Sequence, residues 1–219
     1  MLCLSMVYGS QAKAQTRVNT RLKQQLDSVM ALDQKYREAL TIISDGSKTD
    51  SIAKVYHLPN DNNLAMGLWS LQSKIDSSNV VFAEDIIKRY GYPGKTIVGS
   101  PANESIWNII QHSSKIDSYM PIIKKAAQQK ELPYYLYGMM LDRQLMYAGK
   151  EQIYGSQGTF RQLKTGKKES IIWPVKDPET VNQRRKQAGF TQTVEDNALR
   201  FNIKYRVIKL DEILPQTAK

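Results

Sequence analysis

The spacing of hydrophobic residues predicts a mainly helical chain. Between Leu22 and Ile43 apolar residues recur at helical intervals, and Asp33 interrupts their stripe. The run Asp45-Gly46-Ser47 is a helix stop, so a long first helix ends there. Residues 47–62 are mostly polar and contain Pro59, which is typical of a connection between helices.

A second long helix is predicted after this connection, because apolar residues again follow helical spacing from Leu64 to Ile86. Its other face carries three polar residues, Gln72, Asp76 and Asn79, at positions i, i+4 and i+7. Such a stripe either lines a site or faces solvent, as one side of most amphipathic helices does.

Three further helices are predicted in the middle of the chain. The turn Gly91-Tyr92-Pro93-Gly94 precedes Ser100-Pro101, which has the form of an N-cap followed by a first-turn proline. The helix that starts there extends to about residue 114. The next helices are expected over residues 117–130 and from Pro133 to Gly149.

The pattern changes after Gly149. Two strands, residues 159–163 and 169–175, flank Thr165-Gly166 and predict a hairpin. The remaining elements expected are a basic helix from Asp177 to Gly189, a helix over 193–202 and a last strand over 206–210. The fold class is therefore mainly α, a single-domain helical bundle with a small β-hairpin near the C-terminal third.

Composition adds a basic charge. The 219 residues include 31 Lys and Arg and 21 Asp and Glu, for a formal net charge of +10. Such a charge favours anionic partners, although an ordinary soluble surface explains it equally well. The densest basic groups, near Lys167 and Arg185, do not alternate with stacking aromatic residues. We therefore expect no sequence-specific binding of nucleic acid.

The beginning of the chain indicates export. Leu2 to Tyr8 form a short apolar run, and Ala12-Lys13-Ala14 matches a small-residue cleavage signal, so residues 1–14 form a predicted signal peptide. A disordered cytosolic start is the alternative. Cleavage would leave a mature chain that begins at Gln15 and lacks Cys3, the only cysteine. We expect a periplasmic or secreted protein with no transmembrane segment.

The remaining organisation follows from these boundaries. Residues 15–62 form the long first helix and its connection, and residues 63–210 form a helical domain that includes the hairpin.

The helix from Pro133 to Gly149 is the most informative segment. Its side chains are apolar around nearly the whole circumference, which predicts burial, yet it contains Asp142 and Arg143. Arg143 lies on the same stripe as Met140. A buried guanidinium requires either a salt bridge within the fold or an anionic ligand.

Two other places offer polar chemistry. His112 lies away from the apolar side of its helix, so it is either a surface residue or a general acid or base. The loop after Gly149 carries Gln152, Tyr154 and Gln157, which are neutral donors and acceptors. With two histidines and one cysteine, the sequence favours no metal site, and it contains no cofactor motif.

Several segments together resemble the Domain of Unknown Function 6624 family of uncharacterised bacterial proteins. They are Y-G-Y-P-G-K-T-I-V-G (90–99), W-N-I-I-Q-H (107–112), M-L-D-R (140–143), G-K-E-Q-I-Y-G-S-Q (149–157), P-V-K-D-P-E (174–179) and V-N-Q-R-R-K-Q-A-G (181–189). The resemblance covers about residues 64–205. It implies where a site lies and brings no known reaction.

Two hypotheses for function remain open. In the first, a binding module holds a small anionic or polar ligand with Arg143, Gln152, Tyr154, Gln157 and one or both of Arg184 and Arg185. In the second, a hydrolase uses His112 as general acid or base, with Asp142 orienting it and Arg143 stabilising negative charge. The sequence determines neither the ligand nor the oligomeric state.

Overall fold

The computed structural model describes residues 18–44 and 46–214. Its helices are α1 (Thr20–Ile43), α2 (Thr49–Tyr56), α3 (Leu64–Tyr90), α4 (Lys95–Val98), α5 (Ser105–Gln111), α6 (Ile116–Gln128), α7 (Tyr134–Tyr147), α8 (Val181–Gln187) and α9 (Val194–Leu199). The 3₁₀ turns are η1 (Ala102–Glu104), η2 (Pro178–Thr180) and η3 (Leu210–Glu212), and the strands are β1 (Gly158–Gln162) and β2 (Lys168–Ile172). The prediction of a mainly helical fold with a small hairpin is confirmed.

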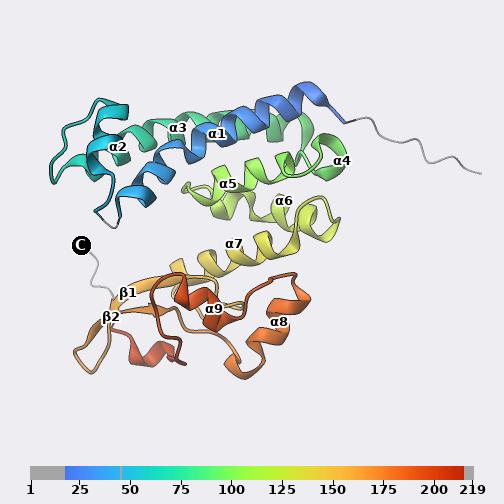
Figure 1. Cartoon of the computed structure of the whole chain (residues 1–219). Helices are drawn as coiled ribbons and strands as arrows, with labels where there is room; N and C mark the ends of the chain where they lie inside the picture. The colour runs from blue at the N-terminus through green and yellow to red at the C-terminus, as the bar shows by residue number, and fades with distance from the viewer. Residues whose placement is uncertain (1–17, 45, 215–219) are drawn as a thin grey trace, which may run out of the picture.

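The elements are stacked in layers. The long helices α1 and α3 run side by side along one edge, and both contact α5 (Figure 1). Helix α6 packs against α7, and beyond α7 lie the β1–β2 hairpin, α8 and α9. Helix α7 therefore occupies the middle of the molecule, which explains why its sequence is apolar on almost every side.

The core is divided into clusters. The main cluster takes Leu22, Leu26 and Val29 from α1 and packs them with residues of α3, α5, α6 and α7. A second cluster joins the far end of α1, at Ala39, to α2 and the start of α3. Asp33 lies on α1 between these two clusters, so the position that interrupts the apolar stripe in the sequence also interrupts the core.

The segment 47–62 is not the simple connection that was predicted. It contains α2, where Ile52 and Tyr56 pack against Tyr36 and Leu40 of α1, and the Tyr36 and Tyr56 ring centroids are 5.0 Å apart. The sequence does not reveal this helix because its eight residues are half polar, and so short a segment has too few apolar positions to show a period.

Two other boundaries differ from the prediction. The segment after Ser100-Pro101 forms a 3₁₀ turn before α5 begins at Ser105. Residues 206–210 do not form a strand; Ile203 and Ile208 instead pack beneath the hairpin, in the apolar clusters of Ile172 and Ile171. Of residues 206–210 only Ile208 is buried, and the alternation of apolar and polar residues in this segment imitates a strand in the sequence.

The β-hairpin is short and regular. Strands β1 and β2 are antiparallel, with Phe160 opposite Ser170, and Gly166 in the turn has a φ of +87°, which suits glycine.

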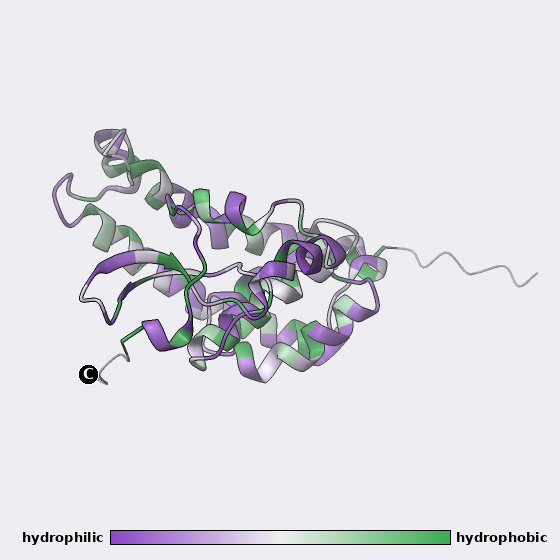
Figure 2. Cartoon of the chain, turned by 90° about the horizontal axis from the view of Figure 1, so that it is seen from below, coloured by the Kyte–Doolittle hydropathy of each residue, from purple (hydrophilic) through white to green (hydrophobic). Residues whose placement is uncertain are grey.

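Along the helices, hydrophobic and hydrophilic residues alternate (Figure 2). Among the described residues, no helix is both long and apolar enough to cross a membrane. The predicted signal peptide, residues 1–14, lies outside the described residues, so export stays a prediction.

Candidate functional site

The break in the core holds a cluster of polar side chains built around Asp33. This carboxylate is only 1% exposed. Its Oδ2 accepts a hydrogen bond from Nε2 of Gln34 at 2.7 Å, and its Oδ1 accepts a long one from Nδ2 of Asn79 at 3.4 Å. Placing a carboxylate in the core costs several kcal/mol unless it is paired. The surrounding polar groups must therefore compensate for the burial of Asp33.

The polar stripe of α3 supplies much of that compensation. Nε2 of Gln72 donates to the backbone oxygen of Asp33 at 3.0 Å and to Oδ1 of Asp76 at 2.8 Å. The same Asp76 oxygen lies 2.6 Å from Nη2 of Arg37, which α1 places one turn beyond Asp33. Both Gln72 and Asn79 are buried. The stripe therefore does not face solvent at Gln72 and Asn79, and these side chains lie in a polar cluster instead.

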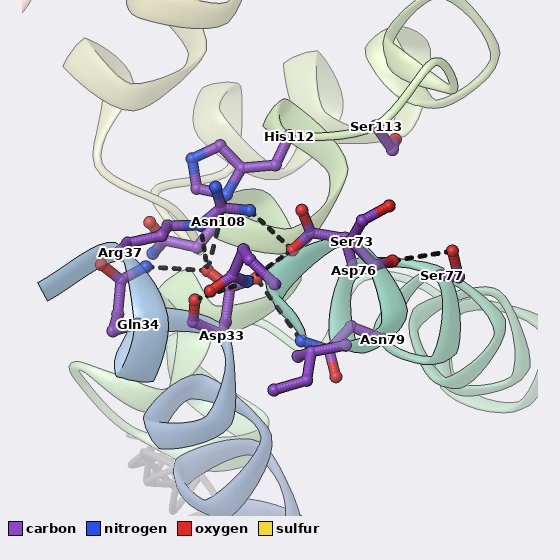
Figure 3. Close-up of polar contacts among 12 residues, drawn as sticks. Asp33, Gln34, Arg37, Ser73, Asp76, Ser77, Asn79, Asn108, His112 and Ser113 are labelled. Atoms are coloured by element: carbon purple, nitrogen blue, oxygen red, sulfur yellow. Dashed lines mark hydrogen bonds and ion pairs between the residues drawn. The ribbon is translucent and has the colours of Figure 1, made fainter. Parts of the chain in front are cut away.

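Helix α5 brings His112 to this cluster from the other side. The helix ends at Gln111, and His112 is its C-cap, with its backbone N–H donating to the oxygen of Ile109 at 3.2 Å. The imidazole Nδ1 lies 3.5 Å from Oδ2 of Asp33 (Figure 3). Nδ1 is buried and makes no hydrogen bond within the described part of the chain. The other ring nitrogen, Nε2, points away from Asp33.

This arrangement gives the two imidazole nitrogens different surroundings. The side chain of His112 is 22% exposed, whereas that of Asp33 is 1% exposed. Nε of Arg37 lies 3.6 Å from the same Oδ2 of Asp33. Nδ1 therefore lies beside a carboxylate that Arg37 also approaches, whereas Nε2 points away from it.

Asp142 does not occupy the position beside His112 that the sequence suggested. Its carboxylate is fully buried and accepts hydrogen bonds from the backbone N–H groups of Ile153 at 2.7 Å, Tyr154 at 3.0 Å and Ser156 at 2.9 Å. Burial raises the pKa of Asp142, and these donors act in the opposite direction. The role of Asp142 is to hold the loop after α7, and Asp33 takes the place beside the histidine.

Arg143 links this loop to the end of α5. Its Nε donates to Oε1 of Gln157 at 3.1 Å, and its Nη1 donates to the backbone oxygen of Gln111 at 2.7 Å. Burial lowers the pKa of Arg143; the charge of Tyr147 raises it and that of Arg37 lowers it. In the described part of the chain Arg143 forms no ion pair, so the predicted internal salt bridge is absent there and its two partners are neutral acceptors.

The loop residues proposed from the sequence are used mainly within the fold. Gln152 donates from Nε2 to the backbone oxygens of Gln157 and Trp173, at 3.1 and 2.6 Å, and its Oε1 accepts from the Gln157 N–H at 2.9 Å. The Tyr154 ring stacks on Phe190, with centroids 5.4 Å apart. These contacts make the loop a rigid connector between α7 and the hairpin.

Arg184 and Arg185 lie apart from the His112 cluster. Arg184 donates to the backbone oxygens of Ile153, Asp177 and Lys176. Arg185 donates to those of Gln192 and Tyr154, at 2.8 and 2.7 Å. The sequence-based site is thus divided: Asp142, Arg143 and the loop lie together, whereas His112 contacts the α1 and α3 cluster.

A cavity of about 550 Å³ lies between the segment that follows His112 and the last part of α7, and neither His112 nor Arg143 lines it. It is lined by Ser113 and Ser114, which follow His112, and by Gln144 and Tyr147 of the Arg143 helix. Asp33 and Arg37 were not recognised as site residues from the sequence, whereas Asp76 belongs to a stripe for which lining a site was one of two interpretations. The signal that would have found them is a charged residue at an apolar position of α1 opposite a polar stripe on α3.

The fold and this site define a mainly helical protein with a buried aspartate beside a partly exposed histidine. Residues 50–204 match the model of DUF6624, a family of unknown function, and the chain belongs to this family. The match includes Asp76, His112 and Arg143, and begins after α1. No curated protein and no solved structure gives a significant match to the chain.

Proposed function

We propose that the chain is a hydrolase in which His112 acts as general acid or base and Asp33 positions its ring. The observation that carries the proposal is the placement of buried Oδ2 of Asp33 3.5 Å from Nδ1 of His112, with Nε2 pointing away from Asp33. A carboxylate on one ring nitrogen fixes the tautomer that leaves the other nitrogen free to accept a proton. Contacts of this kind are often long before substrate binds.

The proposed step uses water as the nucleophile. Nε2 of His112 removes a proton from a water molecule while the water oxygen attacks the electrophilic centre of the substrate. The imidazolium that forms is stabilised by the Asp33 carboxylate, and it then returns the proton to the leaving group. General acid–base catalysis of this type contributes on the order of a hundredfold to ten-thousandfold in rate.

Arg143 supports an anionic substrate for the same site. Its guanidinium is half-buried, binds neutral acceptors, and donates to the carbonyl oxygen of Gln111, whose peptide leads directly into His112. A buried cation with neutral partners favours an anionic group near it. The small anionic ligand proposed for Arg143 would then be the substrate of the hydrolytic site.

The test is a hydrolysis screen with matched histidine variants. The full chain is assayed with p-nitrophenyl acetate, phosphate and glycosides and with a peptide p-nitroanilide. His112→Gln should lower kcat/KM at least about a hundredfold, and Asp33→Asn should lower kcat with KM little changed. His57→Gln, at the only other histidine and exposed, should behave as wild type.

Circular dichroism of each variant separates a lost reaction from a lost fold. A folded His112→Gln variant with the wild-type rate would contradict the proposal. So would a wild-type chain that hydrolyses none of the four bond types above the rate of the double variant H112Q/D33N.

A further inference from the structure

A second cavity lies on the other side of α7, where α8 and α9 approach it. Its volume is about 230 Å³, and its walls include Tyr135, Met139, Arg185, Phe190, Asn197 and Arg200. We call it the Arg185 cavity. It is smaller than the roughly 300–1,000 Å³ of pockets that take drug-sized ligands, so its size suits a small molecule. None of these six residues is a hydrogen-bond or ion-pair partner of His112 or Asp33 within the described chain.

The end of α8 explains how Arg185 comes to be buried there. Gly189 has a φ of +85°, which stops the helix and lets the N–H of Phe190 donate to the backbone oxygen of Arg185 at 3.0 Å. This turn places the Phe190 ring against the guanidinium, with Cζ 4.4 Å from the ring centroid. Arg185 is only 2% exposed as a result.

The charge of Arg185 is left without a direct counter-ion. Nε donates to the oxygen of Gln192 and Nη1 to that of Tyr154, and both acceptors are neutral. Among the described residues, no carboxylate lies within ion-pair distance of this guanidinium. Nη2 has no hydrogen-bond partner among the described residues, and it is not one of their fully buried unpaired atoms. Because Arg185 lines the cavity, Nη2 is the donor that this side chain can offer to a ligand there.

A second cation faces the same space. Arg200, which is exposed, lines the cavity together with Arg185. Burial lowers the pKa of Arg185; the more distant acids Asp142, Glu195 and Asp196 act against this effect, and the like charge of Arg200 adds to it. Two guanidinium groups around one small cavity are mutually unfavourable until an anion lies between them.

We propose that the Arg185 cavity binds a small organic carboxylate with an aromatic or apolar body, at a site separate from His112. One carboxylate oxygen accepts from Nη2 of Arg185 and the other from Arg200. The body of the ligand lies against Met139 and against the rings of Tyr135 and Phe190, whose centroids are 5.9 Å apart.

The lining favours a carboxylate over phosphate or sulfate. The two arginines are the only charged residues of the lining, which also contains the polar Ser156, Thr191, Gln192 and Asn197 and the largely apolar Tyr135, Met139 and Phe190. A tetrahedral dianion has no apolar part to pack against Met139 and Phe190. A carboxylate on an apolar body can bind the arginines and gains from burying that body against these side chains.

Calorimetric titration of the full chain with benzoate tests the proposal, with inorganic phosphate and neutral benzamide as comparison probes. Benzoate should bind with a Kd of about 1 mM or tighter, whereas phosphate and benzamide should bind at least tenfold more weakly, about 1.4 kcal/mol. Arg200→Gln should weaken benzoate binding about tenfold, because a hydrogen bond to a charged group is lost. Arg21→Gln, an exposed arginine of α1, is the matched control and should bind as wild type.

Arg200→Gln is used because Arg185 also supports the fold. Benzoate binding should persist in His112→Gln, which separates this site from the proposed hydrolytic one. The proposal is overturned if wild type binds no benzoate, if benzamide or phosphate binds as tightly, or if Arg200→Gln leaves the benzoate affinity unchanged.

Discussion

Oδ2 of Asp33 lies 3.5 Å from Nδ1 of His112, joining the middle of α1 to the end of α5. The contact lies between two apolar clusters. One contains residues of α3, α5 and α7, and the other is formed by α1, α2 and the start of α3. Asp33 lies before residue 50, where the family match begins, and His112 lies within the match. The proposed reaction therefore requires α1 as well as the matched region.

The first prediction concerns the tautomer of His112. A carboxylate beside Nδ1 favours the neutral ring with its proton on Nδ1 and none on Nε2. Long-range ¹H–¹⁵N spectra at alkaline pH should show this pattern, and the chain has only two histidines to assign. Asp33→Asn should shift His112 toward the Nε2–H form and leave His57 unchanged. A wild-type His112 already in the Nε2–H form would refute the orienting role of Asp33.

The second prediction concerns Asp142 and the stability of the loop after α7. Asp142→Ala leaves the N–H groups of Ile153, Tyr154 and Ser156 without their acceptor. Each unsatisfied buried donor costs about 1–3 kcal/mol, so the free energy of unfolding should fall by at least about 3 kcal/mol. Asp142→Asn keeps one acceptor oxygen and should lose less. Urea denaturation measures both.

A control for this prediction is Asp117→Ala, an exposed aspartate on α6 that accepts one bond, from Gln144. It should change the free energy of unfolding by less than about 1 kcal/mol. An equal decrease in the free energy of unfolding for Asp117→Ala and Asp142→Ala would show that the three backbone hydrogen bonds to Asp142 do not add to stability.

The third prediction separates the shape of Arg143 from its charge. Nε and Nη1 bind two different acceptors, Oε1 of Gln157 and the backbone oxygen of Gln111. An ammonium cannot reproduce this fork. Arg143→Lys should therefore lower the melting temperature by about 2–6 °C, as expected for a loss of about 1–2 kcal/mol in a chain of this size. Arg21→Lys, at an exposed position of α1, should leave it unchanged.

Much of the fold could be predicted from the sequence because long helices repeat a signal. The apolar spacing of α1 and α3 and the turn around Gly166 were all visible along the chain. Helix α2 was not, because its Ile52 and Tyr56 become an apolar face only when α1 supplies Tyr36 and Leu40. The strand predicted around Ile208 is absent, because a single buried isoleucine packed beneath the hairpin needs no ladder partner, and apolar residues on either side of Lys209 resemble a strand in the sequence.

The site was only partly accessible to the same reasoning. The proximity of Asp142 and Arg143 to the following loop is local in sequence. The contact between Asp33 and His112 is not, because it depends on how α1 crosses α5. Periodicity places a residue on a helix face but does not tell which other helix that face meets. In the sequence Asp33 only interrupts an apolar stripe, and its partner His112 becomes visible only in the structure.

The last prediction is a loss of stability in alkali caused by buried tyrosines. Burial, with smaller effects from neighbours that include Tyr134 and Asp142, raises the pKa of Tyr154 to about 12, and burial also raises that of Tyr92. An unfolded tyrosine titrates near pH 10. Between about pH 10 and 12 the folded chain thus holds more protons than the unfolded one, so rising pH favours unfolding. Urea denaturation from pH 8 to 11 should show a constant free energy of unfolding up to about pH 10 and a decline above it. Tyr154→Phe removes one such group and should make the decline shallower, whatever its stability at pH 8. An unchanged slope in Tyr154→Phe would mean that Tyr154 titrates alike in the folded and unfolded chains.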